Sequence, residues 1–240
     1  MNLIDTAEMY GKGASEKVVG EFLKNKNRSD FFVVNKILPS NAKKGLYLER
    51  CKNSLKIMGL DYFDLYLLHW KSNVNLQDMV DNMEKLVELG LIKHWGVSNF
   101  DVHEMEELFR CKNGDHCFAN QCLYNLLSRG VEYDLIDWCD KHNVLFMAYS
   151  PLGNNSIDRN QVTKNKDFIN IAEENDMSPE SLMLNFVIRY PNVMAIFKTS
   201  SIEHLDINMK NVFSTLNQDR LSRIDKIFPP IKKKVPLEKI

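Results

Sequence analysis

The feature that most constrains the fold is an alternation of short apolar runs with polar segments of helical period, which continues along all 240 residues. Runs rich in β-branched and aromatic residues, each followed by an amphipathic segment, are typical of βα units in a parallel sheet. The predicted strands cover residues 2–5, 32–36, 63–69, 94–98, 118–121, 144–150 and 194–197. The predicted helices cover residues 15–23, 46–58, 76–89, 103–109, 133–142, 167–174, 179–189, 203–212 and 218–227.

A parallel sheet of this kind either stays open, as in dinucleotide-binding folds, or closes into a barrel. The Gly-rich segment 11–16 lacks the third glycine of the dinucleotide fingerprint, and the next predicted strand ends in Lys36 instead of an acidic residue. Because that fingerprint fails, the barrel is favoured over the open sheet. The fold class that we predict is α/β, a (β/α)8 TIM barrel, as a single domain over residues 1–240. Only seven strands are recognisable, so the predicted barrel lacks the first strand and helix.

Composition limits the class of partner. Thirty-one Lys and Arg against 32 Asp and Glu give a formal net charge of -1, which provides no field to hold nucleic acid or an anionic membrane. No apolar run approaches the ~20 residues of a membrane-spanning helix, and the first residues lack a signal-peptide pattern, so we predict a cytoplasmic location. Five cysteines without a Cys-x-x-Cys pair predict reduced thiols.

Four polar residues end or follow the first three predicted strands: Asp5, Tyr10, Lys36 and His69. Each alone has a structural explanation, such as a turn cap, a packing aromatic or a solvated strand end. In a βα barrel, however, the carboxyl ends of the strands meet at the active site. There a tyrosine, whose ordinary pKa is about 10, donates a proton near neutrality only if a nearby cation stabilises its phenolate. Lys36 is the predicted cation, held by Asp5, and His69 would position a substrate oxygen.

These four residues stand within motifs that extend the pattern along most of the chain. The motifs are Asp5-Thr6-Ala7-Glu8-x-Tyr10-Gly11-x-Gly13-x-Ser15-Glu16, Leu67-Leu68-His69-Trp70, Gly96-Val97-Ser98-Asn99-Phe100, Asn120-Gln121-x-x-Tyr124-Asn125-Leu126 and Ala148-Tyr149-Ser150-Pro151-Leu152-Gly153. In order and spacing they resemble the aldo-keto reductase family, from residue 2 to about residue 211.

The resemblance implies a (β/α)8 barrel that reduces an aldehyde or ketone with NADP(H), or with NAD(H) as the alternative cofactor. By similarity, Tyr10 is the general acid, Lys36 stabilises its phenolate, Asp5 pairs with Lys36, and His69 orients the carbonyl. No metal is expected. The substrate is a small molecule, and small aldehydes, ketones and sugars stay open.

The resemblance also implies which residues contact the cofactor. These residues are Ser98, Asn99, Gln121, Tyr149, Ser150, Leu152, Lys198, Thr199, Ser200, His204 and Asn208. The first three would hydrogen-bond the nicotinamide carboxamide, Tyr149 would stack on the nicotinamide ring, and Ser150 and Leu152 would begin the pyrophosphate cradle. The other five would lie near the adenosine end, where Lys198 supplies a cation and the helix from Glu203 an N-terminus for phosphate.

The chain departs from the family pattern near the adenosine end. His204 stands where many members place an arginine that clamps the 2'-phosphate, and Ile207 stands where an acidic residue commonly contacts the adenine. An imidazole lacks the charged, bidentate fork of a guanidinium. The preference for NADPH over NADH is therefore expected to be weaker than in those members.

The family's opening strand and helix have no counterpart ahead of Asp5. Three explanations stay open: a natural chain that starts earlier, self-association in which another copy fills the gap, or a shortened paralogue with impaired catalysis. The last makes a cofactor-binding regulatory subunit with little or no catalysis the alternative function. A (β/α)8 isomerase or phosphate-binding enzyme is a third candidate, and the loops after the last two strands only partly match it.

Overall fold

The structure is a computed structural model that describes residues 2–43 and 45–240. It contains two compact units, one ending at Asn120 and the other spanning Gln121–Ile240. Four parallel strands of the first unit are hydrogen-bonded in chain order: β1 (Leu3–Asp5), β2 (Phe32–Ile37), β3 (Phe63–Leu68) and β4 (Ile92–Ser98). Strand β5 (Ala119–Leu123) begins at the end of the first unit and continues into the second.

The register of the first three strands brings their carboxyl ends to one edge of the sheet. Asp5 pairs with Val34 and Ile37 pairs with Leu68. The His69 N–H then donates to the carbonyl of Ile37 (3.0 Å), which continues the ladder one residue past β3. Every residue of β3 is buried, as expected for a parallel strand that is covered on both faces.

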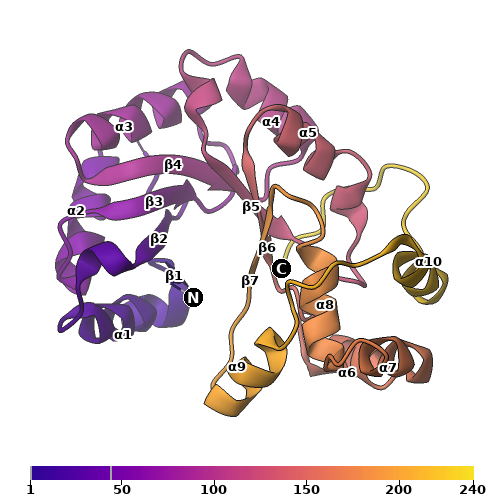
Figure 1. The fold of residues 1–240 in the computed structure, drawn as a ribbon. Helices are drawn as coiled ribbons and strands as arrows, with labels where there is room; N and C mark the ends of the chain where they lie inside the picture. The colour runs from indigo at the N-terminus through magenta and orange to yellow at the C-terminus, as the bar shows by residue number, and fades with distance from the viewer. Residues whose placement is uncertain (1, 44) are drawn as a thin grey trace. The chain divides into compact units, whose positions relative to one another are not determined.

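Amphipathic helices cover this sheet. They are α1 (Ala14–Leu23), α2 (Tyr47–Met58), α3 (Leu76–Glu88) and α4 (Val102–Phe109). Helix α2 packs against β2 and α3 against β4, on one side of the sheet (Figure 1). Side-chain caps fix two of the helix starts: Asn75 accepts from the Asp78 N–H, and Asp101 forms a capping box with Glu104.

The second unit contains the parallel pair β6 (Leu145–Tyr149) and β7 (Val193–Ile196). Its helices are α5 (Leu135–Lys141), α6 (Ser156–Thr163), α7 (Lys166–Glu173), α8 (Pro179–Val187), α9 (Ile202–Met209) and α10 (Gln218–Ile227). Helix α8 begins as predicted, with Ser178 as the N-cap and Pro179 at the first helical position.

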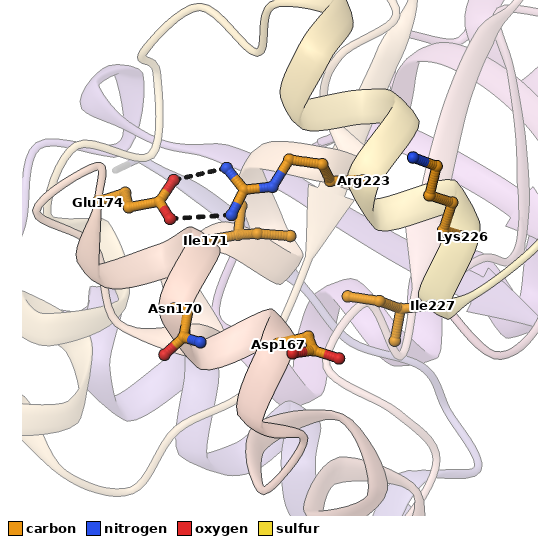
Figure 2. A pocket seen from close by; sticks show the side chains of 7 residues that line it. All are labelled: Asp167, Asn170, Ile171, Glu174, Arg223, Lys226 and Ile227. Atoms are coloured by element: carbon orange, nitrogen blue, oxygen red, sulfur yellow. Dashed lines mark hydrogen bonds and ion pairs between the residues drawn. The ribbon is translucent and has the colours of Figure 1, made fainter.

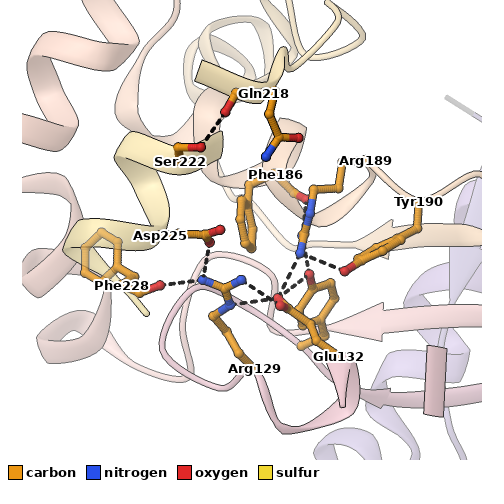
Figure 3. A network of polar contacts seen from close by, with 10 residues as sticks. Arg129, Glu132, Phe186, Arg189, Tyr190, Gln218, Ser222, Asp225 and Phe228 are labelled. Carbon is orange, nitrogen blue, oxygen red and sulfur yellow. Dashed lines mark hydrogen bonds and ion pairs between the residues drawn. The ribbon is translucent and has the colours of Figure 1, made fainter. Parts of the chain in front are cut away.

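A buried polar network holds α10 within this unit (Figure 3). The Glu132 carboxylate contacts the guanidinium groups of Arg129 (2.6 Å) and Arg189 (3.1 Å), and all three side chains are at most 10% exposed. Arg129 also donates to the Asp225 carboxylate (2.8 Å) and to the Phe228 carbonyl, so both partners lie at the end of α10. Because a buried guanidinium is costly unless its donors are satisfied, these contacts fix where α10 ends.

The predicted strands and helices are all present, with ends that shift by a few residues. Helix α9 ends at Met209 instead of residue 212, because Lys210 has extended backbone angles. Helix α6 was not predicted, because its apolar residues have no helical period, although the Asn155 side chain caps it by accepting from the Ile157 and Asp158 N–H groups. The described residues also contain four short 3-10 helices that were not predicted: η1 (Tyr10–Gly13), η2 (Arg28–Asp30), η3 (Gly114–His116) and η4 (Gly130–Glu132).

Gly96 on β4 allows the close approach of the following strand, and its replacement by alanine is expected to destabilise the protein. A Cβ atom at Gly96 would lie 2.3 Å from the carbonyl oxygen of Ala119, which is backbone and cannot swing aside. Overpacking of this kind costs about 1–3 kcal/mol. Urea denaturation of Gly96→Ala should therefore show a lower free energy of unfolding.

The matched control is Gly130→Ala, whose new Cβ would meet only a side-chain methyl group of Val235 at 3.2 Å and no backbone atom. This control is expected to lose less than ~1 kcal/mol. Equal losses in the two variants would contradict the role assigned to Gly96.

Candidate active site

The centre of the candidate site is the ammonium group of Lys36, whose side chain is completely buried near the end of β2. It lies 2.5 Å from Asp5 Oδ1, 3.0 Å from the Thr6 carbonyl oxygen and 3.3 Å from the Tyr10 hydroxyl oxygen. An ammonium has three donors, and here three acceptors surround it. Since the Tyr10 oxygen accepts from Lys36, the phenolic proton of Tyr10 points elsewhere and can be donated to another group.

Tyr10 is brought to Lys36 by a tight turn after β1. The Tyr10 N–H donates to the Ala7 carbonyl (3.0 Å), and the backbone then passes through left-handed angles at Gly11, Lys12 and Gly13 (φ 57°, 55° and 89°). Two of these three positions are glycine, the residue that adopts such angles without steric cost. The glycines of this segment therefore serve the turn that presents Tyr10.

His69 follows β3 and lies beside Tyr10, with ring centroids 5.7 Å apart in an edge-on arrangement. Burial, and secondly the positive charge of Lys36, lower the pKa of His69 from 6.5 to about 4. The ring is thus neutral near pH 7, with one N–H donor and one acceptor nitrogen. Its Nδ1 atom is buried and has no partner among the described residues. The ring of Trp70, which is 36% exposed, also lies near His69, with centroids 5.2 Å apart.

Two of the residues predicted to contact the nicotinamide, Ser98 and Asn99, lie close to His69 in the structure. Ser98 ends β4 and Asn99 follows it, and both are buried. The Asn99 amide donates to the His69 carbonyl oxygen (3.2 Å) and to Ser98 Oγ (3.1 Å). The backbone of Asn99 is left-handed (φ 62°), which asparagine tolerates better than most residues.

The remaining predicted cofactor contacts lie in the second unit. Gln121 is buried on β5, and Tyr149 ends β6, where Ser150 and Leu152 follow it in the next turn. Lys198, Thr199 and Ser200 lie between β7 and α9, with an exposed His204 and a buried Asn208 on α9 itself. Their contacts with a cofactor stay predictions.

Hydrogen bonds order the loop that leads into α9. Thr199 Oγ1 lies 3.2 Å from both the N–H and the carbonyl oxygen of Ser201. The Ser201 hydroxyl accepts from the His204 N–H (3.2 Å) and so caps the helix. The exposed ammonium of Lys198 precedes this helix start, an arrangement of cation and N-terminus that suits a phosphate group.

Two residues that hold the Lys36 backbone, Asn35 and Glu16, were not predicted as site residues from the sequence. Asn35 Oδ1 accepts from the Lys36 backbone N–H (2.8 Å), and Asn35 Nδ2 donates to the buried carboxylate of Glu16 (2.8 Å). Glu16 belongs to the first motif, so its place in that motif was the only signal in the sequence. Trp70 was likewise signalled only by its position directly after His69.

A surface depression elsewhere in the second unit contains none of the predicted site residues. It lies between α7 and α10 and is lined by Asp167, Asn170, Ile171, Glu174, Arg223, Lys226 and Ile227 (Figure 2). Its main polar feature is a two-pronged ion pair between Glu174 and Arg223 (2.6 and 2.8 Å). Because this pair is largely exposed, we interpret it as a surface contact between two helices.

Within residues 2–43 and 45–240, no group of three or more His, Cys, Asp or Glu side chains is arranged to hold a metal ion. In the same ranges, no helix has both the length and the apolar character needed to cross a bilayer.

The lowered pKa of His69 predicts a pH-dependent contribution to stability. Between pH 4 and pH 6.5 the unfolded chain binds a proton at His69 that the folded chain does not, so this contribution falls as the pH drops through that window. Lowering the pKa of His69 from 6.5 to about 4 corresponds to about 3 kcal/mol. The free energy of unfolding of the wild type, minus that of His69→Gln, should decrease by about this amount from above pH 6.5 to pH 4.

Urea denaturation at several pH values measures this difference, with His103→Gln on the exposed surface of α4 as the matched control. A difference that stays constant across the window would contradict the lowered pKa.

Comparison with known proteins identifies the family. A sequence model described as "Aldo/keto reductase family" matches residues 1–228. The chain is 41% identical to methylglyoxal reductase YeaE of Escherichia coli (strain K12) over 240 residues, covering 100% of this chain and 84% of the relative. It is 30% identical to glyoxal reductase of Bacillus subtilis (strain 168) over 225 residues, which are 92% of this chain and 77% of that one.

A solved structure agrees with this result. The aldo/keto reductase of Klebsiella pneumoniae, crystallised with NADP and acetate, matches with a TM-score of 0.96 and 41% identity, over 100% of this chain and 84% of that chain. This likeness confirms the predicted fold class, α/β with the strands of a (β/α)8 barrel. The chain therefore belongs to the aldo/keto reductase family.

Proposed function

We propose that this chain reduces a small aldehyde or ketone to an alcohol with hydride from NADPH, and that 2-oxoaldehydes such as methylglyoxal are its substrate class. The observation that carries the proposal is the contact between the buried Lys36 ammonium and the Tyr10 hydroxyl oxygen at 3.3 Å. Its supporting residues Asp5 and His69 are both present beside it. This complete set favours catalysis over a non-catalytic regulatory subunit.

Tyr10 is the proton donor in this proposal. As the carbonyl oxygen of the substrate gains negative charge, Tyr10 gives it the phenolic proton and becomes a phenolate. The neighbouring ammonium of Lys36 stabilises that phenolate, and the Asp5 carboxylate at 2.5 Å keeps Lys36 in place. A neutral His69 donates its N–H to the same carbonyl oxygen and orients the substrate.

NADPH, when bound, supplies the hydride that completes the reduction. In the first unit, Ser98 and Asn99 offer polar side chains suited to the nicotinamide carboxamide, and the Asn99 amide is held by the backbone carbonyl of His69. In the second unit, the Lys198 ammonium and the capped start of α9 suit a phosphate group. The NADP bound to the Klebsiella pneumoniae relative agrees with the cofactor predicted from the sequence.

The proposed substrate class rests on two observations. Met9 directly precedes Tyr10, and Trp70 follows His69 with its ring 5.2 Å from the imidazole; these apolar side chains are 44% and 36% exposed, which suits contact with a small substrate. The two relatives from Escherichia coli and Bacillus subtilis are named as methylglyoxal and glyoxal reductases, and both of those compounds are small dicarbonyls.

Replacing Tyr10 with phenylalanine tests the proton donor. Tyr10→Phe removes one hydroxyl and is expected to lower kcat for methylglyoxal at least ~100-fold while the affinity for NADPH changes little. The rate is followed as the loss of NADPH absorbance, and the affinity by quenching of tryptophan fluorescence. Tyr133→Phe, which removes a hydroxyl from a half-exposed ring, is the matched control. Turnover retained in Tyr10→Phe would refute the assigned role.

Replacing His204 with arginine tests whether this position lies near the 2'-phosphate at the adenosine end of NADPH. His204 is exposed in the first turn of α9, so an arginine there can present its fork to a 2'-phosphate without disturbing the core. The ratio of the Kd for NADH to the Kd for NADPH should rise about tenfold, which corresponds to one charge-assisted hydrogen bond. His103→Arg, on α4, controls for the added charge. An unchanged ratio would mean that His204 does not approach the 2'-phosphate.

A further inference from the structure

Asn125 connects the turn after β5 to the turn after β6. It is 1% exposed, and its Nδ2 atom donates to the carbonyl oxygen of Ser150 (3.1 Å). Its Oδ1 atom accepts from the backbone N–H groups of Leu127 and Ser128, both at 2.9 Å. One buried amide thus fixes its own turn through its oxygen and a second turn through its nitrogen.

The turn that Asn125 reaches has a strained backbone. Ser150 has φ 52°, in the left-handed region, although it is not glycine and precedes Pro151, a position where the extended region is preferred. The Ser150 carbonyl oxygen accepts a second hydrogen bond from the Gly153 N–H (3.0 Å), which closes the turn. Both lone pairs of this oxygen are therefore occupied, one by the turn itself and one by Asn125.

The chain around Asn125 is rigidly held. The Tyr124 N–H donates to the Tyr149 carbonyl oxygen (3.3 Å), one residue before the contact between Asn125 and Ser150. The Tyr124 hydroxyl donates to Glu132 (2.7 Å) and accepts from Arg189, so it contacts two members of the buried network described above. Asn125 is therefore held firmly in place. It contacts the turn at Ser150, whose left-handed backbone conformation is not favoured by the local sequence Ser150-Pro151.

We propose that Asn125 is a positioning residue for the cofactor: its amide holds Ser150 in the left-handed conformation and so prepares the Tyr149–Gly153 segment for the nicotinamide and pyrophosphate of NADPH. This inference rests on the proposed function, because Tyr149, Ser150 and Leu152 are cofactor contacts only in that proposal. Asn125 itself touches neither substrate nor cofactor. Its effect should appear in cofactor affinity and not in the chemical step.

The test is Asn125→Asp, which keeps an oxygen for the Leu127 and Ser128 N–H groups and replaces the donor to Ser150 with an acceptor. The Kd for NADPH should rise about tenfold, the effect of losing one buried hydrogen bond to the Ser150 carbonyl and placing a carboxylate oxygen against it. The KM for NADPH should rise in parallel, while kcat and the KM for methylglyoxal stay within about twofold. Asn170→Asp, an exposed residue of α7, is the matched control for the added charge.

A glycine at residue 150 provides a signature that general destabilisation would not produce. Glycine adopts φ 52° without steric cost, so Ser150→Gly should make the turn less dependent on Asn125. In the Ser150→Gly background, Asn125→Asp should raise the Kd for NADPH by less than about threefold. An equal effect in both backgrounds, or a Kd in the single variant within about twofold of wild type, overturns the proposal.

A second variant and a measurement without cofactor test the role of Asn125 independently of the proposed function. If Asn125→Asp does not fold, Asn125→Ser replaces it, because its hydroxyl still accepts from the following N–H groups but is too short to reach Ser150. Hydrogen exchange of the Gly153 amide in the protein without cofactor should be faster in either variant than in wild type. If wild type binds no nicotinamide cofactor, the proposed function fails; unchanged Gly153 exchange overturns the role of Asn125 in either case.

Discussion

The buried ammonium of Lys36 is the constraint around which the first unit is arranged. A positive charge with no solvent exposure costs several kcal/mol unless each of its donors meets an acceptor. The acceptors come from Asp5, from the carbonyl of Thr6 and from Tyr10, all within six residues of one another at the end of β1. The fold of this short segment and the burial of Lys36 therefore depend on each other, and the geometry of the proposed acid follows from both.

The same charge separates the roles of Tyr10 and His69. Lys36 accepts no hydrogen bond, so its contact leaves the Tyr10 proton free for transfer and stabilises the phenolate that results. For His69 the neighbouring cation adds to the effect of burial in lowering its pKa, so the imidazole stays neutral. A neutral imidazole can orient an oxygen through one N–H but is a poor source of a proton. One buried cation thus makes the phenol the acid and the imidazole the orienting group.

Much of this arrangement could be predicted from the sequence, because it depends on periods and on strand ends. The alternation of apolar runs located all seven strands, and the rule that parallel strands share an edge brought Asp5, Lys36 and His69 together. Contacts between side chains on distant segments could not be predicted, since a pattern indicates the buried face and not the partner. The pair formed by Glu16 and Asn35 is such a contact, and so is the amide of Asn125. Helix α6 was missed because capping, without an apolar period, defines it.

Several residues that follow the strands have left-handed backbone angles, and they differ in what stabilises this conformation. Gly11 and Gly13 follow β1, Asn99 follows β4 and Ser150 follows β6, each at the carboxyl end of a strand. At the first of these positions glycine makes the conformation inexpensive, and at Asn99 the amide holds its own turn by binding His69 and Ser98. Ser150 has neither advantage, so a side chain from another turn must hold it. The physical reason to assign a role to Asn125 is therefore the strain at Ser150, which no pattern in the sequence indicates.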